Sequence, residues 1–236
     1  MLDIKNIKSV IKTSFIDWPG HISMVLFLSR CNFRCHYCHN KQLVIDPGAI
    51  KDISFYTILN MLNKYHEWID GVVISGGEPT LNEHIFELVT IIKNIGLKVK
   101  LDTNGSRPDI LKKLINDKLV DYVAMDIKTN LNKIDYSAIT GVPCLRIELI
   151  NKSIDLLLQN KIDYEFRTTI FPIFIKENNI ELIARRIKGA KRYNLQQFRN
   201  NNTLDPYCES VTPYKKETLE YFKKIILKYV NECNII

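Results

Sequence analysis

The stretch ISMVLFLSRCNFRCHYCHN, residues Ile22–Asn40, joins a run of apolar residues to a short loop that contains three cysteines. The apolar part, Ile22–Ser29, has the length and composition of a strand buried on both faces, as the strands of a parallel sheet are. Cys31, Cys35 and Cys38 follow with the spacing C-x3-C-x2-C. Function in parallel α/β folds gathers at the carboxyl ends of strands, so this loop is the first candidate site.

Five further runs of strand length follow along the chain, and segments with helical periodicity separate them. Asp52 or Ser54 is the expected cap of the first helix, Asn82 of the second and Thr212 of the last. The helical segments lie within residues 52–69, 82–96, 107–118, 144–160, 178–190 and 212–230. The strands are expected at Gly71–Ser75, Lys98–Thr103, Asp121–Asp126, Asp163–Ile170 and Arg192–Phe198.

Strand–helix alternation that repeats six times predicts an α/β fold with parallel strands and crossover helices. Six units are fewer than the eight of a closed barrel, which favours a partial (β/α)6 TIM-like barrel that is open on one side. A flat, doubly wound sheet is the alternative that the pattern leaves open. A single domain is expected over residues 1–236, with a C-terminal helix over 213–232.

The composition is that of a soluble globular protein, with 236 residues of which 46% are hydrophobic and 25% charged. No signal peptide and no run of ~20 apolar residues is recognisable, so we expect a cytoplasmic protein without membrane contact. Six cysteines in a reducing compartment indicate metal or redox chemistry, although the isolated Cys144, Cys208 and Cys233 are expected to be free thiols. The net charge of +7 is spread along the chain, and no nucleic-acid partner is expected.

The cysteine loop leaves two kinds of metal site open, because thiolates bind both zinc and iron–sulfur clusters. A structural zinc site needs a fourth ligand, which His36 or His39 can supply. A 4Fe–4S cluster held by only three thiolates leaves one iron without a protein ligand. That vacant position parallels the open position that a catalytic metal keeps for its substrate.

Polar groups also follow the other predicted strands. In SGGEP, Ser75–Pro79, the glycines Gly76 and Gly77 would let a ligand approach the backbone and would expose N–H donors, and Glu78 would accept from an ammonium group. A tight strand-to-helix turn that needs small residues is the structural alternative. The remaining strand ends carry DTNG at Asp102–Gly105, DIK at Asp126–Lys128, RTT at Arg167–Thr169 and QQF at Gln196–Phe198.

Four charged residues at these strand ends could each bind a ligand group. Asp102 and Asp126 suit a ribose hydroxyl or an ammonium group, and Lys128 lies two residues beyond Asp126 and should point the same way. Lys128 and Arg167 suit a carboxylate. The alternatives are solvated charges at strand ends and, for Arg167, an ion pair with a neighbouring aspartate.

C-x3-C-x2-C followed by GGEP resembles the signature of the radical S-adenosylmethionine (SAM) enzymes. The match is close to the glycyl-radical-enzyme activases, and several motifs resemble those of the anaerobic ribonucleoside-triphosphate reductase activating proteins. The resemblance covers about residues 14–206. It rests on SFIDWPGHISMVLFLSRCNFRCHYCHN, GVVISGGEPTL, KVKLDTNGS, VDYVAMDIKT, DYEFRTTIFP and LQQFRNNNTLDP.

The resemblance implies which residues hold the cofactors. Three cysteines would ligate a 4Fe–4S cluster, a tyrosine would lie near the adenine of SAM, the GGE turn would receive its amino group, and charged strand ends would line its pocket. A SAM-contacting histidine of formate-lyase activases has no counterpart on the last two strands. The residues so implied are Cys31, Cys35 and Cys38 for the cluster, and Tyr37, Gly76, Gly77, Glu78, Asp102, Asp126, Lys128 and Arg167 for SAM.

The resemblance also implies the reaction. Flavodoxin or ferredoxin would supply an electron, SAM would be cleaved reductively, and a glycyl radical would form on a partner enzyme, an anaerobic ribonucleotide reductase. No side chain is required as a general acid or base. The alternatives are a formate-lyase type of partner, a small-molecule substrate such as a deazaguanine precursor, and a zinc- or cluster-stabilised module that binds nucleic acid.

Overall fold

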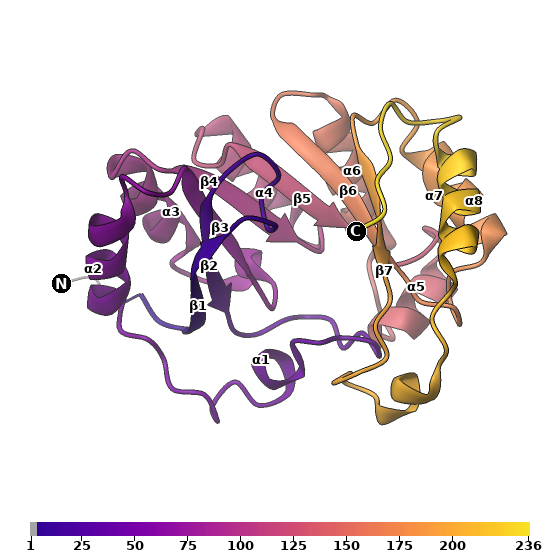
Figure 1. Ribbon diagram of the computed structural model, residues 1–236, viewed down its shortest axis with the longest axis horizontal. Helices are drawn as coiled ribbons and strands as arrows, with labels where there is room; N and C mark the ends of the chain where they lie inside the picture. The colour runs from indigo at the N-terminus through magenta and orange to yellow at the C-terminus, as the bar shows by residue number, and fades with distance from the viewer. Residues whose placement is uncertain (1–3) are drawn as a thin grey trace. The chain divides into compact units, whose positions relative to one another are not determined.

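The computed structural model describes residues 4–236, which form a seven-stranded sheet with the strands in chain order, β1 to β7. The first strand, β1 (Ile7–Ser14), runs antiparallel to β2 (Ser23–Leu28). The pairs β2–β3, β3–β4 and β6–β7 are parallel. The α/β class with a mostly parallel sheet is therefore confirmed, and Figure 1 shows the strands in their order.

The described residues divide into two compact units. The first contains residues 4–32, 42–103 and 109–123, and the second contains residues 33–41, 104–108 and 124–236. The expectation of one domain over the whole chain stays a prediction.

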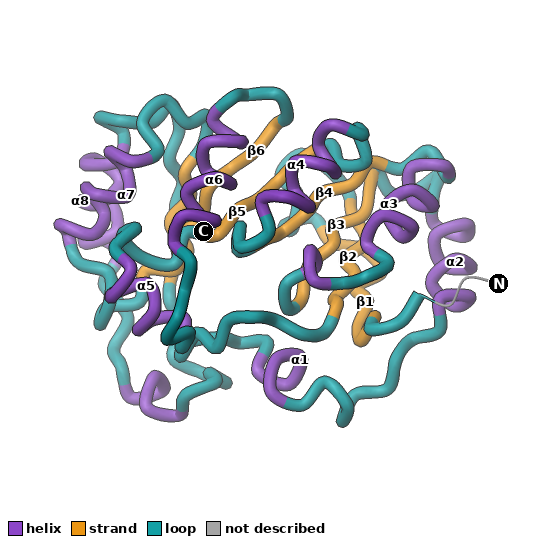
Figure 2. Tube along the Cα trace, turned by 180° about the vertical axis from the view of Figure 1, so that it is seen from behind, coloured by secondary structure: helices purple, strands orange, loops and turns teal. Residues whose placement is uncertain are grey.

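The first unit is built on β1, β2, β3 (Gly71–Gly76) and β4 (Lys98–Thr103). Its central strands are buried on both faces, as the apolar run Ser23–Leu28 predicts. Figure 2 shows α3 and α4 in front of β3 and β4, so these helices cover one face of the sheet. The helices are α1 (Lys41–Ile45), α2 (Phe55–Tyr65), α3 (Ile85–Asn94) and α4 (Pro108–Asn116), with a 3-10 turn η1 at Pro79–Leu81.

The second unit contains the end of β5 (Tyr122–Asp126), β6 (Asp163–Ile170) and β7 (Tyr193–Gln197). The chain end extends this sheet, because Tyr193 N donates to Glu232 O at 3.0 Å and Gln197 N to Ile236 O at 2.8 Å. The helices are α5 (Lys133–Thr140), α6 (Ile147–Leu158), α7 (Glu177–Arg186) and α8 (Lys216–Ile226), with a 3-10 turn η2 at Pro206–Ser210.

Two predicted helix starts are wrong. The C-terminal helix begins at Lys216 and ends at Ile226, not at 213 and 232, because hydrogen bonds from the Tyr214 hydroxyl to Ile175 O and from Gln197 to Tyr214 O hold the preceding segment extended. The helix expected after Asn82 begins at Ile85, because η1 occupies Pro79–Leu81 first. Ser54, one of the two caps considered, does cap α2 by accepting from Thr57 N at 3.2 Å.

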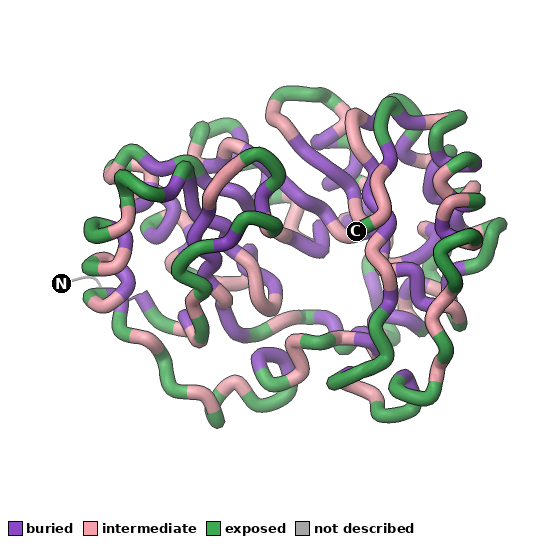
Figure 3. Tube along the Cα trace, in the orientation of Figure 1, coloured by how far each residue is buried: buried purple, intermediate pink, exposed green. Residues whose placement is uncertain are grey.

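The burial pattern follows the strands β2 to β7, which are mostly buried in Figure 3, whereas β1 is mostly exposed or half-buried. Among residues 4–236, no helix is both long and apolar enough to span a lipid bilayer.

Candidate active site

The GGEP turn of the first unit is packed directly against the end of β2. Gly76 has a φ of +112°, and a Cβ on it would overlap the backbone of Leu28. A Cβ on Gly77 would overlap the carbonyl of Arg30. Gly77 N donates to Leu28 O at 2.8 Å. This N–H is therefore engaged within the chain, whereas the sequence led us to expect an exposed donor. Backbone contact between the two strand ends is thus sufficient to require both glycines.

Glu78 is a buried carboxylate that organises the turn from inside. It is 1% exposed, and its Oε1 accepts hydrogen bonds from Thr80 N at 3.2 Å, from the Thr80 hydroxyl, and from Thr103 Oγ1 at 2.7 Å. The carboxylate therefore ties η1 to the end of β4. A capping role for Glu78 has direct structural support, and its contact with the amino group of SAM remains an expectation.

The residue before the first cysteine is anchored to the same turn. Arg30 has a left-handed backbone with a φ of +71°, its N donates to Leu43 O at 2.9 Å, and its carbonyl accepts from Glu78 N at 2.8 Å. Cys31, half-buried, follows immediately. The turn thus fixes the point at which the cysteine loop leaves the first unit.

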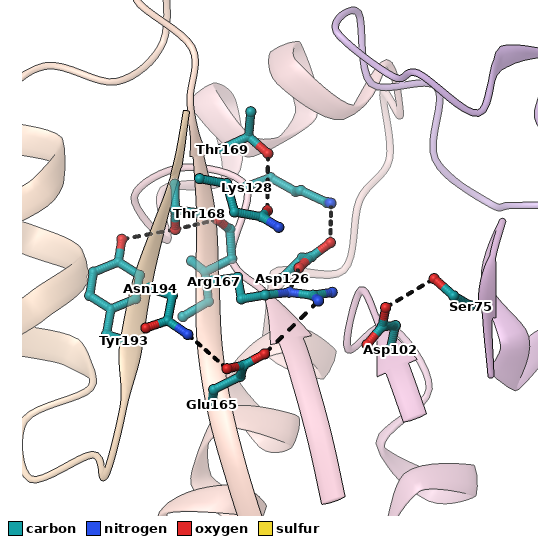
Figure 4. A network of polar contacts seen from close by, with 12 residues as sticks. Ser75, Asp102, Asp126, Lys128, Glu165, Arg167, Thr168, Thr169, Tyr193 and Asn194 are labelled. Atoms are coloured by element: carbon teal, nitrogen blue, oxygen red, sulfur yellow. Dashed lines mark hydrogen bonds and ion pairs between the residues drawn. The ribbon is translucent and has the colours of Figure 1, made fainter. Parts of the chain in front are cut away.

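Asp102, at the end of β4, is held by two side chains of the first unit. Ser75 Oγ donates to Asp102 Oδ2 at 3.0 Å, as Figure 4 shows, and Lys100 Nζ lies 3.7 Å from Asp102 Oδ1. Lys100 is only 2% exposed. We did not single out this lysine from the sequence, although its position two residues before Asp102 places both side chains on one face of the strand.

The rest of the cysteine loop belongs to the second unit. Cys38 N donates to Cys35 O at 3.0 Å, and Arg34 N donates to Thr140 O at 2.7 Å, which fixes the loop on α5. Cys35 is 7% exposed and Cys38 is half-buried, and burial raises the pKa of the Cys38 thiol. His36 is engaged at both ring nitrogens, by Asp205 at 3.2 Å and Ala138 O at 3.0 Å, which argues against it as a zinc ligand.

Tyr37 lies between the two cysteines of the second unit and is 5% exposed. Its ring packs on Phe171 with centroids 5.5 Å apart, while its buried hydroxyl has no hydrogen-bond partner among residues 4–236. Burial raises the pKa of Tyr37, and the charge of Lys128 is near enough to oppose this rise. A buried, unsatisfied hydroxyl in a native fold calls for an explanation, and a bound ligand is one.

Asp126, Lys128 and Arg167 form one ion-pair cluster in the second unit (Figure 4). Lys128 Nζ donates to Asp126 Oδ2 at 2.9 Å, and Arg167 Nε donates to Asp126 Oδ1 at 2.8 Å. Burial acts to raise the pKa of Asp126, but the two cations outweigh it and lower the pKa to about 2. Lys128, which was expected to point the same way as Asp126, forms an ion pair with it, and Arg167 pairs with a neighbouring aspartate, the structural alternative considered for it.

A second buried carboxylate extends this cluster. Glu165 is 3% exposed, lies 4.0 Å from Arg167 Nη1, and accepts from Asn194 Nδ2 at 2.7 Å. Sequence reasoning missed both Glu165 and Asn194. The available signal was the strand alternation, because Glu165 and Arg167 are two residues apart and Asn194 is the register partner of Arg167 on β7.

Comparison with known proteins gives a consistent result. The sequence pattern of the Radical SAM superfamily matches residues 25–188. A protein of Methanocaldococcus jannaschii, provisionally named a glycyl-radical enzyme activating enzyme, is 34% identical over 97% of this chain and 95% of its own length. The pyruvate formate-lyase-activating enzyme of Clostridium pasteurianum is 26% identical over 91% of this chain and 87% of its own length.

Among solved structures, Streptococcus suis SuiB bound to its precursor peptide SuiA superposes with a TM-score of 0.68 at 14% identity, over 89% of this chain. The chain spans about half the length of SuiB, 48%, and at 14% identity the likeness concerns the fold alone. These matches confirm the expected fold class. The chain belongs to the radical SAM superfamily, is homologous to glycyl-radical enzyme activating enzymes, and is an enzyme that uses a 4Fe–4S cluster and S-adenosylmethionine.

Proposed function

We propose that this enzyme activates a partner enzyme by generating a glycyl radical on it. The observation that carries the proposal is the match to a glycyl-radical enzyme activating enzyme over 97% of this chain and 95% of the relative. Because the match extends over almost the whole of both chains, it includes the parts that would recognise the substrate as well as the shared catalytic core.

The side chains present fit the two cofactors. The thiols of Cys31, Cys35 and Cys38 are the ligand type that binds iron–sulfur clusters, and three of them leave one iron for SAM. In the first unit, the GGE turn Gly76–Glu78 and Asp102 are proposed to meet the amino group and a hydroxyl of SAM. In the second unit, we assign Tyr37 to the adenine side, and Asp126, Lys128 and Arg167 to the polar groups of the pocket.

When bound, the cluster and SAM supply one-electron chemistry: an electron and SAM yield methionine and 5′-deoxyadenosine as a hydrogen atom leaves the substrate glycine. The chain's own residues bind and orient. The Asp126 carboxylate keeps both the ammonium of Lys128 and the guanidinium of Arg167 in place, and Glu165 is a second, more distant carboxylate beside Arg167. Two preoriented cations are thereby available for a carboxylate without rearrangement at the moment of binding.

For the partner, we propose an anaerobic ribonucleoside-triphosphate reductase, with flavodoxin or ferredoxin as the electron donor. The sequence motifs quoted above support this assignment, notably the absence of a histidine in DYEFRTTIFP and LQQF. A partner of the formate-lyase type is the second candidate, which the similarity to the Clostridium pasteurianum enzyme over 91% of this chain favours.

The test is anaerobic mixing of the cluster-loaded protein with SAM, a reductant and each candidate partner in turn. The expected result is a glycyl-radical doublet in the EPR spectrum with the reductase and not with a formate lyase. The reverse pattern would support the second candidate. If SAM is cleaved but neither partner acquires a radical, the activase proposal fails while the enzyme class stands.

A further inference from the structure

A buried lysine lies next to Asp102 in the first unit and has no part in the function proposed so far. Lys100 is 2% exposed. It lies on the same face of β4 as Asp102, because the two are two residues apart in the strand. Lysine is almost never fully buried unless its charge is compensated. The groups around its ammonium therefore indicate why it is there.

Three neighbours in the first unit surround the Lys100 ammonium. Its Nζ donates to the backbone carbonyl of Asp17 at 2.5 Å and lies 5.6 Å from the centroid of the Tyr122 ring. Both of these groups are neutral, and they favour a cation without neutralising it. The third neighbour is the carboxylate of Asp102, whose Oδ1 is 3.7 Å away and carries the compensating charge.

Within the first unit, Asp102 is consequently held by Ser75 and by Lys100. Ser75 donates to Asp102 Oδ2 at 3.0 Å, while the Lys100 ammonium faces Asp102 Oδ1. Ser75 and Asp102 directly follow Ile74 and Leu101, which are register partners on β3 and β4. The side chain of Asp102 remains 17% exposed, so the carboxylate can still meet a ligand. A carboxylate that is fixed before binding loses less conformational freedom when the ligand arrives.

We propose that Lys100 is a positioning residue for SAM binding, which acts by holding the Asp102 carboxylate in a fixed orientation. The inference rests on the proposed function, in which Asp102 lines the SAM pocket. A purely structural lysine would stabilise the fold without being coupled to the ligand through Asp102. The two roles therefore differ in whether the effects of changing Lys100 and Asp102 on SAM affinity are independent.

The experiment is a double-mutant cycle on the cluster-loaded protein, with the Kd of SAM measured by anaerobic equilibrium dialysis. Lys100→Met removes the charge and the donor at similar length. Lys100→Gln removes the charge and keeps an N–H that can bond the Asp17 carbonyl, so it remains informative if Lys100→Met fails to fold. We expect each variant to weaken SAM binding about tenfold, and to cause no further loss in the Asp102→Asn background.

Lys93→Met is the matched control, because Lys93 pairs with Asp121 at 2.7 Å in the same unit and does not contact Asp102. It should leave the Kd of SAM unchanged. SAM binding by the Lys100 variants at the wild-type level, or an equal loss in the Asp102→Asn background, would overturn the inference while leaving the proposed function intact. If the wild-type protein itself neither bound nor cleaved SAM, the proposed function would fail first and this inference with it.

Discussion

Arg167 Nε donates to Asp126 Oδ1 over 2.8 Å, a bond that joins two neighbouring strands of the second unit. Lys128 Nζ occupies the other carboxylate oxygen at 2.9 Å. Because these cations outweigh the effect of burial, the pKa of Asp126 is lowered to about 2, and the carboxylate is ionised at neutral pH. The ion-pair cluster of Asp126, Lys128 and Arg167 is thus a fixed set of charges and not a proton donor or acceptor.

The first prediction concerns acid stability. The pKa of Asp126 is lower in the folded chain than its ordinary value of 3.8, so its contribution to stability is present above pH 4 and is lost as pH falls toward 2. This contribution is about 2 kcal/mol. The free energy of unfolding of the cluster-free protein, measured by urea denaturation, should therefore fall between pH 5 and pH 2 by about 2 kcal/mol more in the wild type than in Asp126→Asn.

At neutral pH, Asp126→Asn should itself be destabilising by about 3–5 kcal/mol, because it removes the carboxylate that pairs with the buried Lys128 and the nearer of the two carboxylates that pair with Arg167. Asp117→Asn is the control, since Asp117 is exposed and its change should not alter the acid profile. Identical pH dependence in Asp126→Asn and the wild type would contradict the assignment of the low pKa to this residue.

The parallel part of the fold is predictable from the sequence because buried strands are continuous apolar runs. Gly71–Gly76 and Asp163–Ile170, for example, lie within a residue of where the pattern places them. The strand Ile7–Ser14 was missed because its residues are mostly polar or charged and it pairs on one side only, so neither length nor apolar content distinguishes it. Short helices such as Lys41–Ile45 have too few turns to show a period.

Residues of the candidate site can be predicted from the sequence only where they belong to a recognisable motif. The cysteine spacing and GGEP can be read directly, whereas Lys100 and Glu165 lie inside strands and their importance depends on neighbours that are far apart in sequence. Lys100 meets Asp17 O, and Glu165 meets Asn194. A charged residue inside an otherwise apolar strand is the signal that could have found both.

The second prediction tests the close contact between the GGEP turn and the cysteine loop. Gly77→Ala places a Cβ against the carbonyl of Arg30, a backbone atom that cannot move without displacing Cys31. We expect the free energy of unfolding, measured by denaturation, to fall by about 2–4 kcal/mol. We also expect the protein to bind the iron–sulfur cluster less tightly, measured by iron content. Gly48→Ala is the matched control, because its Cβ would meet only Asp46 Oδ1 at 3.5 Å and should be tolerated.

The third prediction separates the three motif cysteines from the other three. Changing Cys31, Cys35 or Cys38 to alanine should abolish the iron–sulfur absorption and SAM cleavage after anaerobic reconstitution, because each thiolate is proposed to hold one iron. Cys144→Ala should keep both, since Cys144 is an exposed free thiol outside the loop. Full iron content in the Cys35→Ala protein would show that this residue is not a ligand.

The last prediction concerns the Tyr37 hydroxyl. It is buried and has no hydrogen-bond partner among residues 4–236, so Tyr37→Phe removes a desolvated polar group and no protein contact. The free energy of unfolding of the cluster-free protein should therefore stay within about 1 kcal/mol of the wild type or rise.

The affinity for SAM should move in the opposite direction. If the hydroxyl bonds the bound ligand, Tyr37→Phe weakens SAM binding in the cluster-loaded protein about 5- to 10-fold, the value of one hydrogen bond. Tyr193→Phe is the matched control: its buried hydroxyl already donates to Thr168 Oγ1 at 2.8 Å, so its loss should lower stability and spare SAM affinity. Unchanged SAM affinity in Tyr37→Phe would remove the hydroxyl from the pocket and leave only the ring, packed on Phe171, to meet the adenine.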